Sequence, residues 1–169
     1  MTLQSGVPVL VNLPFLFAYQ EAIYGDGFLA EVAIRHGRVL VKYEGERVCM
    51  YGVNPGDLAE GGKTLAEAHA EFRKSITAVL FDLALETNGF DEFRAAVESF
   101  VTTTNEPVLA DWHEAVQDVR SLRIAERAEH DGLPVLPAES AVSIVVTKKQ
   151  QNRLTAADNI LEPEPALAA

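Results

Sequence analysis

Residues 38–53 read RVLVKYEGERVCMYGV, and this stretch decides the fold. Side chains alternate between two faces from Arg38 to Tyr43, and a second β-rich run follows Glu44-Gly45-Glu46, a pattern typical of two strands joined by a tight turn. A further β-rich run, Phe28–Arg35, comes before it, and His36-Gly37 offers a turn between them. We therefore predict an antiparallel β-meander with three strands at 28–35, 38–43 and 47–53.

The clearest helix signal lies at residues 64–87. Thr64 and Glu67 form an S/T-x-x-E capping box at its start, and Asn88-Gly89 is a stop signal at its end. Between them, apolar residues recur three and four positions apart. These are Leu65, Ala68, Phe72, Ile76, Val79, Leu80 and Leu83. The pattern predicts a long helix that packs one face against the sheet.

The rest of the chain adds helices and one late strand. We predict a second helix at 91–101, and a third that Asn105 caps and Asp131-Gly132 ends. Ala141–Thr147 is rich in β-branched residues and predicts a last strand. Strands joined by short turns are antiparallel, so the fold class is α+β: a meander sheet packed by a long helix, with additional helices and a late strand.

Composition excludes several classes of protein. The chain has 169 residues and a net charge of −11, which argues against general nucleic-acid binding and makes a nucleic-acid partner unexpected. Its one cysteine, Cys49, cannot form an internal disulfide, so we expect a cytoplasmic protein. The longest apolar run, residues 7–18, is too short to span a membrane and contains two prolines.

Three regions follow from these patterns. Residues 1–27 are predicted to be an N-terminal apolar arm, which either buries itself in the fold or packs on a second subunit. Residues 28–150 form the α+β domain, with a helical insertion at about 90–131. Residues 151–169 are a flexible Pro/Ala-rich tail. The arm and an exposed sheet edge favour a homo-oligomer, a dimer or higher.

Catalytic and metal-binding patterns are weak. The four histidines are not spaced for metal binding, and Cys49 in a strand is more typical of a buried structural residue than of a nucleophile. We therefore expect no enzyme activity, metal or cofactor. An enzyme that uses His69, Cys49 or the acidic residues stays as a third hypothesis.

Acidic residues concentrate between Glu86 and Asp118. Eight acidic residues and one basic residue, Arg94, give this region −7 of the total −11. Such a surface is either a solvated helical face or a docking face for a basic partner. The candidate partner-binding residues are Asp91, Glu92, Glu98, Asp111, Glu114 and Asp118.

The segment from Val39 to Phe72 resembles the HicB-like antitoxin domain. That family has a strand pair, a proline-glycine turn, a short third strand, the motif G-D-T-x-x-E-A and a long helix. Here Val53–Gly56 stands at the turn, and Gly62–Ala68, GKTLAEA, stands at the motif. The residues that carry the resemblance are Asn54, Pro55, Gly56, Asp57, Gly62, Thr64 and Glu67.

The resemblance implies a partial RNase-H-like sheet without the catalytic carboxylates of true RNase H. In HicA–HicB pairs, such domains bind and neutralise a small basic RNA-cleaving toxin. We therefore expect a non-catalytic protein-binding domain, an antitoxin-type protein or a solitary homologue, that binds a small basic partner. The arm and the helical insertion depart from the family, and no ribbon-helix-helix follows residue 147. The alternative is a self-associating structural or regulatory module.

Overall fold

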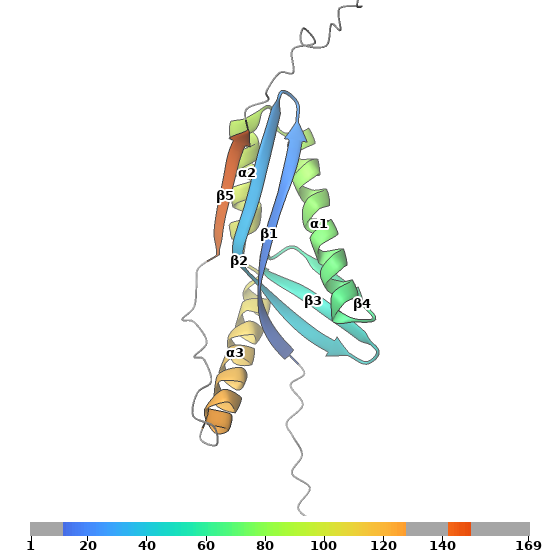
Figure 1. The fold of residues 1–169 in the computed structure, drawn as a ribbon, viewed down its shortest axis with the longest axis vertical. Coiled ribbons are helices and arrows are strands. Elements are labelled where there is room, and N and C mark those ends of the chain that lie inside the picture. Colours follow the sequence, from blue (N-terminus) through green and yellow to red (C-terminus); the bar gives the residue numbers. More distant parts are fainter. Residues whose placement is uncertain (1–11, 128–141, 150–169) are drawn as a thin grey trace, which may run out of the picture.

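The computed structural model describes residues 12–127 and 142–149. Figure 1 shows one antiparallel sheet with helices packed against it, which confirms the α+β class and the meander. The described elements are β1 (Asn12–Gly25), β2 (Phe28–Glu44), β3 (Arg47–Asn54), β4 (Ala59–Gly62), α1 (Leu65–Glu86), α2 (Phe90–Thr102), α3 (Glu106–Arg127) and β5 (Ser143–Lys149).

β2 is the central strand of the sheet. One of its edges pairs with β1 along the whole length of β1. Its other edge pairs with β5 in its first half and with β3 in its second half, and β4 continues the sheet beyond β3. The sheet curls, so that α1 contacts β1, β3 and β4 together. This curl brings the first strand of the meander close to the helix that follows the last one (Figure 1).

The predicted turn at His36-Gly37 is wrong, because the two predicted strands around it are the single strand β2. His36 has a φ of 56°, and the register with β1 shifts between Phe17 and Tyr19. This is a β-bulge, which bends a strand and increases its twist without reversing it. Gly37 is required here, since a Cβ at this position would lie 2.4 Å from the Phe17 ring.

The predicted N-terminal arm contains a strand of the sheet. The first strand begins at Asn12 rather than at Phe28, and it buries Phe17, Tyr19 and Ile23. Residues 1–11 and the predicted tail at 151–169 lie outside the described residues, as does the predicted helix end at Asp131-Gly132. The part of the predicted arm that the structure describes therefore belongs to the domain.

α1 confirms the helix predicted at 64–87. The Thr64 side chain accepts a hydrogen bond from the Glu67 backbone N–H at 3.1 Å. The Glu67 carboxylate accepts one from the Lys63 N–H at 2.8 Å, one residue before the position that a capping box specifies. The buried face of the helix packs on the sheet through Ala68, Phe72, Ile76, Leu80 and Ala84.

The other two helices cover opposite faces of the sheet. α2 adds Phe93, Val97 and Val101 to the core that α1 forms with the sheet. α3 packs Trp112 and its neighbours against Leu40 and Val53, in a second apolar cluster. Since Leu40 alternates with Val39 and Val41 of the first core, this cluster lies on the other face of β2. In the described part of the chain, no helix has the length and apolar character needed to cross a bilayer.

Candidate binding groove

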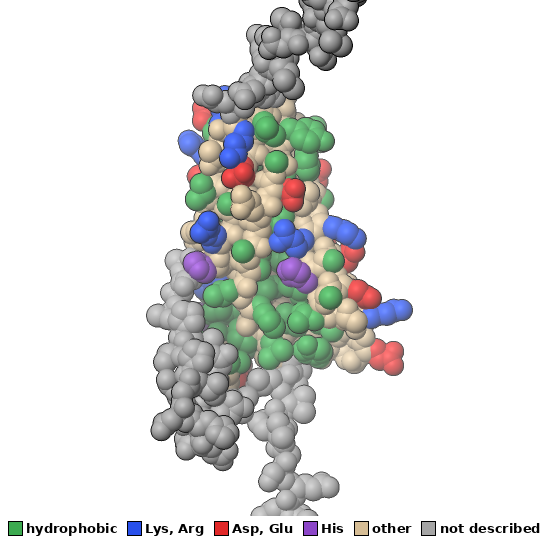
Figure 2. All heavy atoms as spheres, viewed as in Figure 1, with side chains coloured by type: hydrophobic (Ala, Val, Ile, Leu, Met, Phe, Trp, Pro, Cys, Tyr) green, Lys and Arg blue, Asp and Glu red, His purple; other side chains and the backbone are tan. Residues whose placement is uncertain are grey.

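An apolar groove of about 590 Å³ lies between β1 and the first turns of α1. We call it the binding groove. Figure 2 shows hydrophobic side chains gathered on the lower part of the viewed face. The groove is lined by Phe15, Leu16, Phe17, Ala18, Val39, Val41, Met50, Leu65, Ala66 and His69.

The floor of the groove belongs to the core, whereas its rim is open. Val39, Val41 and Met50 are buried, and they come from β2 and β3. On the rim, Phe15 is 38% exposed and Leu16 is 44% exposed. Phe15 stands opposite Val39 in the antiparallel register, so the two side chains share the face that α1 covers. Large apolar side chains exposed beside an apolar hollow are typical of an interaction site.

The groove is closed at one end by a contact between α1 and β1. Arg73 donates a hydrogen bond to the Ala18 carbonyl at 3.0 Å, and its guanidinium lies 5.2 Å from the centre of the Tyr19 ring. The Tyr19 hydroxyl lies 2.9 Å from Thr77 Oγ1. Burial raises the pKa of Tyr19, which keeps the phenol protonated in this contact.

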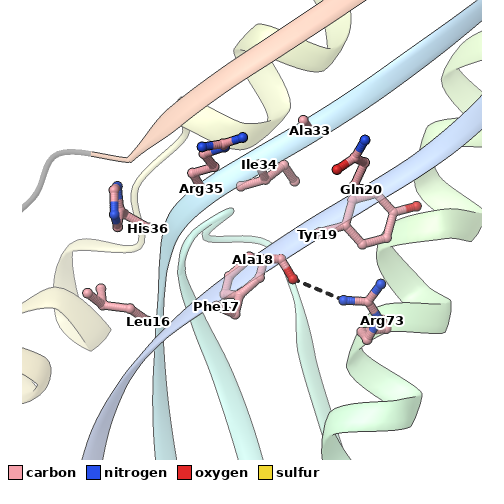
Figure 3. Close-up of a pocket in the computed structure, with 10 residues that line it drawn as sticks. All are labelled: Leu16, Phe17, Ala18, Tyr19, Gln20, Ala33, Ile34, Arg35, His36 and Arg73. Atoms are coloured by element: carbon pink, nitrogen blue, oxygen red, sulfur yellow. Dashed lines mark hydrogen bonds between the residues drawn. The ribbon is translucent and has the colours of Figure 1, made fainter.

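A shallow basic depression of about 600 Å³ adjoins the closed end of the groove, and the two share Leu16, Phe17 and Ala18. Figure 3 shows Arg73 reaching Ala18 from α1, while Arg35 and His36 lie on the other side of β1, on β2. The bulge at His36 places these basic groups at the end of an otherwise apolar hollow.

β1 is an edge strand of the sheet, and its residues just before Ala18 line the groove. It pairs with β2, and among residues 12–127 and 142–149 no other strand pairs with it. An edge strand presents backbone N–H and C=O groups that can pair with another chain. The binding groove therefore combines two features that an extended peptide can use: backbone groups for hydrogen bonds and an apolar floor for alternate side chains.

The predicted turn residues build the fold and lie away from this groove. Asn54 is buried and joins three elements: it accepts from Arg38 Nε at 2.9 Å and donates to Thr104 Oγ1 at 2.7 Å and to the Thr102 carbonyl at 3.4 Å. The peptide bond from Asn54 to Pro55 is cis. This turn therefore docks on the connection between α2 and α3.

The remaining motif residues are also structural. The Gly56 N–H donates to the Thr103 carbonyl at 2.9 Å, and a Cβ on Gly56 would lie 2.4 Å from the Asn105 nitrogen. A Cβ on Gly62 would lie 2.6 Å from that of Glu67. Asp57 is exposed. These contacts explain the small residues at both motif positions by close packing.

The six acidic candidates do not form one cluster of equivalent groups. Asp111 is half-buried and pairs with Lys42 at 2.9 Å. Glu92 accepts a hydrogen bond from the Asn88 N–H at 2.9 Å, and Asp91 lies 3.8 Å from Arg94. Exposed positions on α2 and α3 hold Asp91, Glu92, Glu98, Glu114 and Asp118.

The structure places His69 and Cys49, two candidates of the enzyme hypothesis, on opposite faces of the sheet. His69 lines the groove beside Met50, whereas Cys49 alternates with Met50 and so points to the opposite face of β3. The Cys49 thiol lies 3.6 Å from the Glu44 carboxylate, which also accepts from the Tyr51 hydroxyl at 2.9 Å. Within the described residues, no three His, Cys, Asp or Glu side chains gather in a way that could hold a metal ion.

The groove residues were missed as a site in the sequence. A signal was available, because the longest apolar run of the chain, residues 7–18, contains Phe15, Leu16 and Phe17, three large apolar residues in succession. At least one of three successive large apolar side chains in a strand lies on the face opposite to the other two.

The hydrogen bond between Tyr51 and Glu44 can be tested by titration. It lies on the face of the β2–β3 hairpin that points away from the groove. This hydrogen bond to the Glu44 carboxylate raises the pKa of Tyr51 from 10.0 to about 12. Because the pKa is higher in the folded state, the contribution to stability is complete below pH 10 and is lost as the pH rises towards 12. We expect Tyr51→Phe to lose less stability over this window than the wild type.

Ultraviolet titration of the folded protein measures the same effect directly. In the Tyr51→Phe variant, the phenol that ionises near pH 12 should be missing, whereas the exposed control Tyr43→Phe should retain it. A Tyr51 that ionises at its ordinary pKa would contradict the role given to Glu44.

Comparison of the chain with models of protein families, with curated proteins and with solved structures finds no match.

Proposed function

We propose that this chain is a non-catalytic protein-binding domain of the HicB-like kind, which holds an extended apolar segment of another chain in the binding groove. The observation that carries the proposal is the exposure of Phe15 and Leu16 beside an apolar floor, on a strand whose other edge pairs with no described strand. In strand addition, main-chain hydrogen bonds supply affinity and pockets for alternate side chains supply specificity.

The small basic partner that the HicB-like resemblance implies belongs to this proposal. The exposed carboxylates of Glu98, Glu114 and Asp118 on α2 and α3 support it, because a field of one sign accelerates association with a partner of the other sign. The antitoxin role and a cytoplasmic location stand as parts of the same proposal. Their support is the motif from Asn54 to Glu67 and the lone cysteine.

Self-association is the second candidate function. The observation that favours it is the register of β1 with β2. Asn12 already stands opposite Lys42, and β2 ends at Glu44. β2 therefore extends only two residues beyond the partner of Asn12, and the residues that precede Asn12 in the sequence, Val7–Val11, are apolar.

A random-peptide library displayed on phage tests the groove. We expect the wild-type protein to enrich peptides in which apolar residues alternate. Phe15→Lys should bind the enriched peptides at least about tenfold more weakly, because a charge replaces an apolar contact. Leu85→Lys is the matched control, since Leu85 is 82% exposed at the far end of α1. No enrichment, or equal binding by Phe15→Lys, would overturn the proposal.

A further inference from the structure

In the register between β1 and β2, the start of β1 lies close to the end of β2. Asn12 stands opposite Lys42, so only Tyr43 and Glu44 remain in β2 before the chain turns at Gly45. Yet the preceding segment, Val7–Val11, reads VPVLV and is wholly apolar. The free energy of such a segment falls when another surface removes its apolar side chains from water.

The sequence directly before β1 does not favour a tight hairpin onto the groove of the same chain. Such a hairpin would have its turn at Leu10-Val11. Two-residue hairpin turns require positive φ angles, which favour Gly and Asn, and a β-branched residue such as Val11 is a poor fit for that conformation. This turn chemistry favours a second chain as the source of the occupant.

We propose that Val7–Val11 of one copy pairs antiparallel with the free edge of β1 in a second copy, reciprocally, and places its valine side chains on the groove floor. The inference rests on the proposed function of the groove and names its occupant. A two-fold axis would let the same edge serve both copies, as the commonest dimers do. The dimer would therefore fill two identical grooves at once.

The side-chain pattern fits this occupant. Val7, Val9 and Val11 have the same parity as Leu13 and Phe17, which pack on the core beneath the groove. When an antiparallel register pairs odd positions with odd positions, all of these side chains share one face. Pro8 and Pro14 have no backbone N–H, so the pairing would depend on hydrogen bonds from the other residues of the two segments.

Charge also favours a second copy at this place. Two chains of net charge −11 repel each other, but residues 7–20 contain no Asp, Glu, Lys, Arg or His. Arg73 donates a hydrogen bond to the Ala18 carbonyl, so the pairing is limited to the residues of β1 that precede Ala18 in the chain. The contact would therefore use an uncharged stretch of each chain.

Sedimentation or light scattering of the full chain at micromolar concentration tests the inference. We expect the wild type to be a dimer, and Val9→Lys to raise the dissociation constant of the dimer by about 100-fold, because the ammonium group would lie on an apolar floor. Gln4→Lys adds the same charge outside the apolar segment and should leave the dimer unchanged. A monomeric wild type, or a Val9→Lys variant as dimeric as the wild type, would overturn the inference.

A labelled peptide of residues 6–13, GVPVLVNL, separates this inference from the proposed function. It should bind the full-length Val9→Lys protein, whose own segment is disabled, and should not bind the Val9→Lys, Phe15→Lys double variant. If the peptide does not bind but library peptides do, the second copy is the wrong occupant and the groove function stands. If neither binds, both proposals fail.

Discussion

Asn54→Ala should destabilise the protein by about 3 kcal/mol. Asn54 is 2% exposed and links β2, β3 and the connection between α2 and α3 through its side-chain hydrogen bonds. Alanine would leave the partly buried Arg38 guanidinium without this acceptor and the Thr102 carbonyl without this donor. Removing one partner of a buried charged hydrogen bond costs more than the bond contributes in net terms, because the other partner stays desolvated.

Thermal unfolding followed by circular dichroism checks this expectation. For a domain of this size the loss corresponds to a fall in Tm of roughly 6 to 12 °C. Asn54→Asp keeps an acceptor for Arg38 and loses the amide donor, so its Tm should lie between those of the wild type and Asn54→Ala. The exposed Asn88→Ala is the control. A Tm for Asn54→Ala within about 2 °C of the wild type would contradict the linking role of this side chain.

Trp112→Ala should be at least as costly, at about 3 to 5 kcal/mol. Trp112 is the largest side chain of the cluster that holds α3 against Leu40 and Val53. The Arg38 guanidinium also lies 5.6 Å from the centre of its ring, so the same residue connects this cluster to Asn54. Alanine would remove the apolar contacts and leave a cavity between α3 and the sheet.

Trp112→Phe is the discriminating control in chemical denaturation. The indole Nε1 is buried and makes no hydrogen bond within the described residues, so its loss removes an unsatisfied donor. Phenylalanine keeps most of the apolar ring, and we expect a loss of only about 1 kcal/mol. If Trp112→Ala were as stable as Trp112→Phe, α3 would not depend on this anchor.

The two variants should also show coupling, because both act on Arg38. Asn54 accepts its hydrogen bond, and Trp112 lies under its guanidinium. Contacting residues are commonly non-additive. This connection could not be predicted from the sequence, because the motif identifies Asn54 only as a turn residue and gives no sign of its contact with Arg38.

The elements that local rules define were predicted well. The capping box at Thr64 and the stop at Asn88-Gly89 bound α1 to within one residue at either end, and Asn105 caps α3 by accepting from the Val108 N–H at 3.2 Å. The turn at Gly45 has the positive φ, 63°, that its glycine predicts. Each of these features depends on hydrogen bonds or dihedral angles within a few residues, so the amino-acid types suffice to define it.

Features that depend on residues far apart in the chain were not predicted. His36-Gly37 has the composition of a turn, but pairing with β1 on one side and with β5 and β3 on the other keeps it in one bent strand. The strand from Asn12 to Gly25 likewise depends on β2, which supplies its hydrogen-bond partners.

The fold class, the caps, the hairpin turn and the apolar face of the long helix therefore follow from the amino-acid types and their spacing. Only the tertiary structure decided that β1 lies at an edge and that the bulge bends β2. It also decided that Phe15, Met50 and Leu65, from three separate elements, line one groove. The two kinds of feature depend on contacts at different distances along the chain. A repeat of two or 3.6 residues shows which side of a strand or helix is apolar. The curl of the sheet, which depends on residues far apart in the chain, decides which parts of that side stay open.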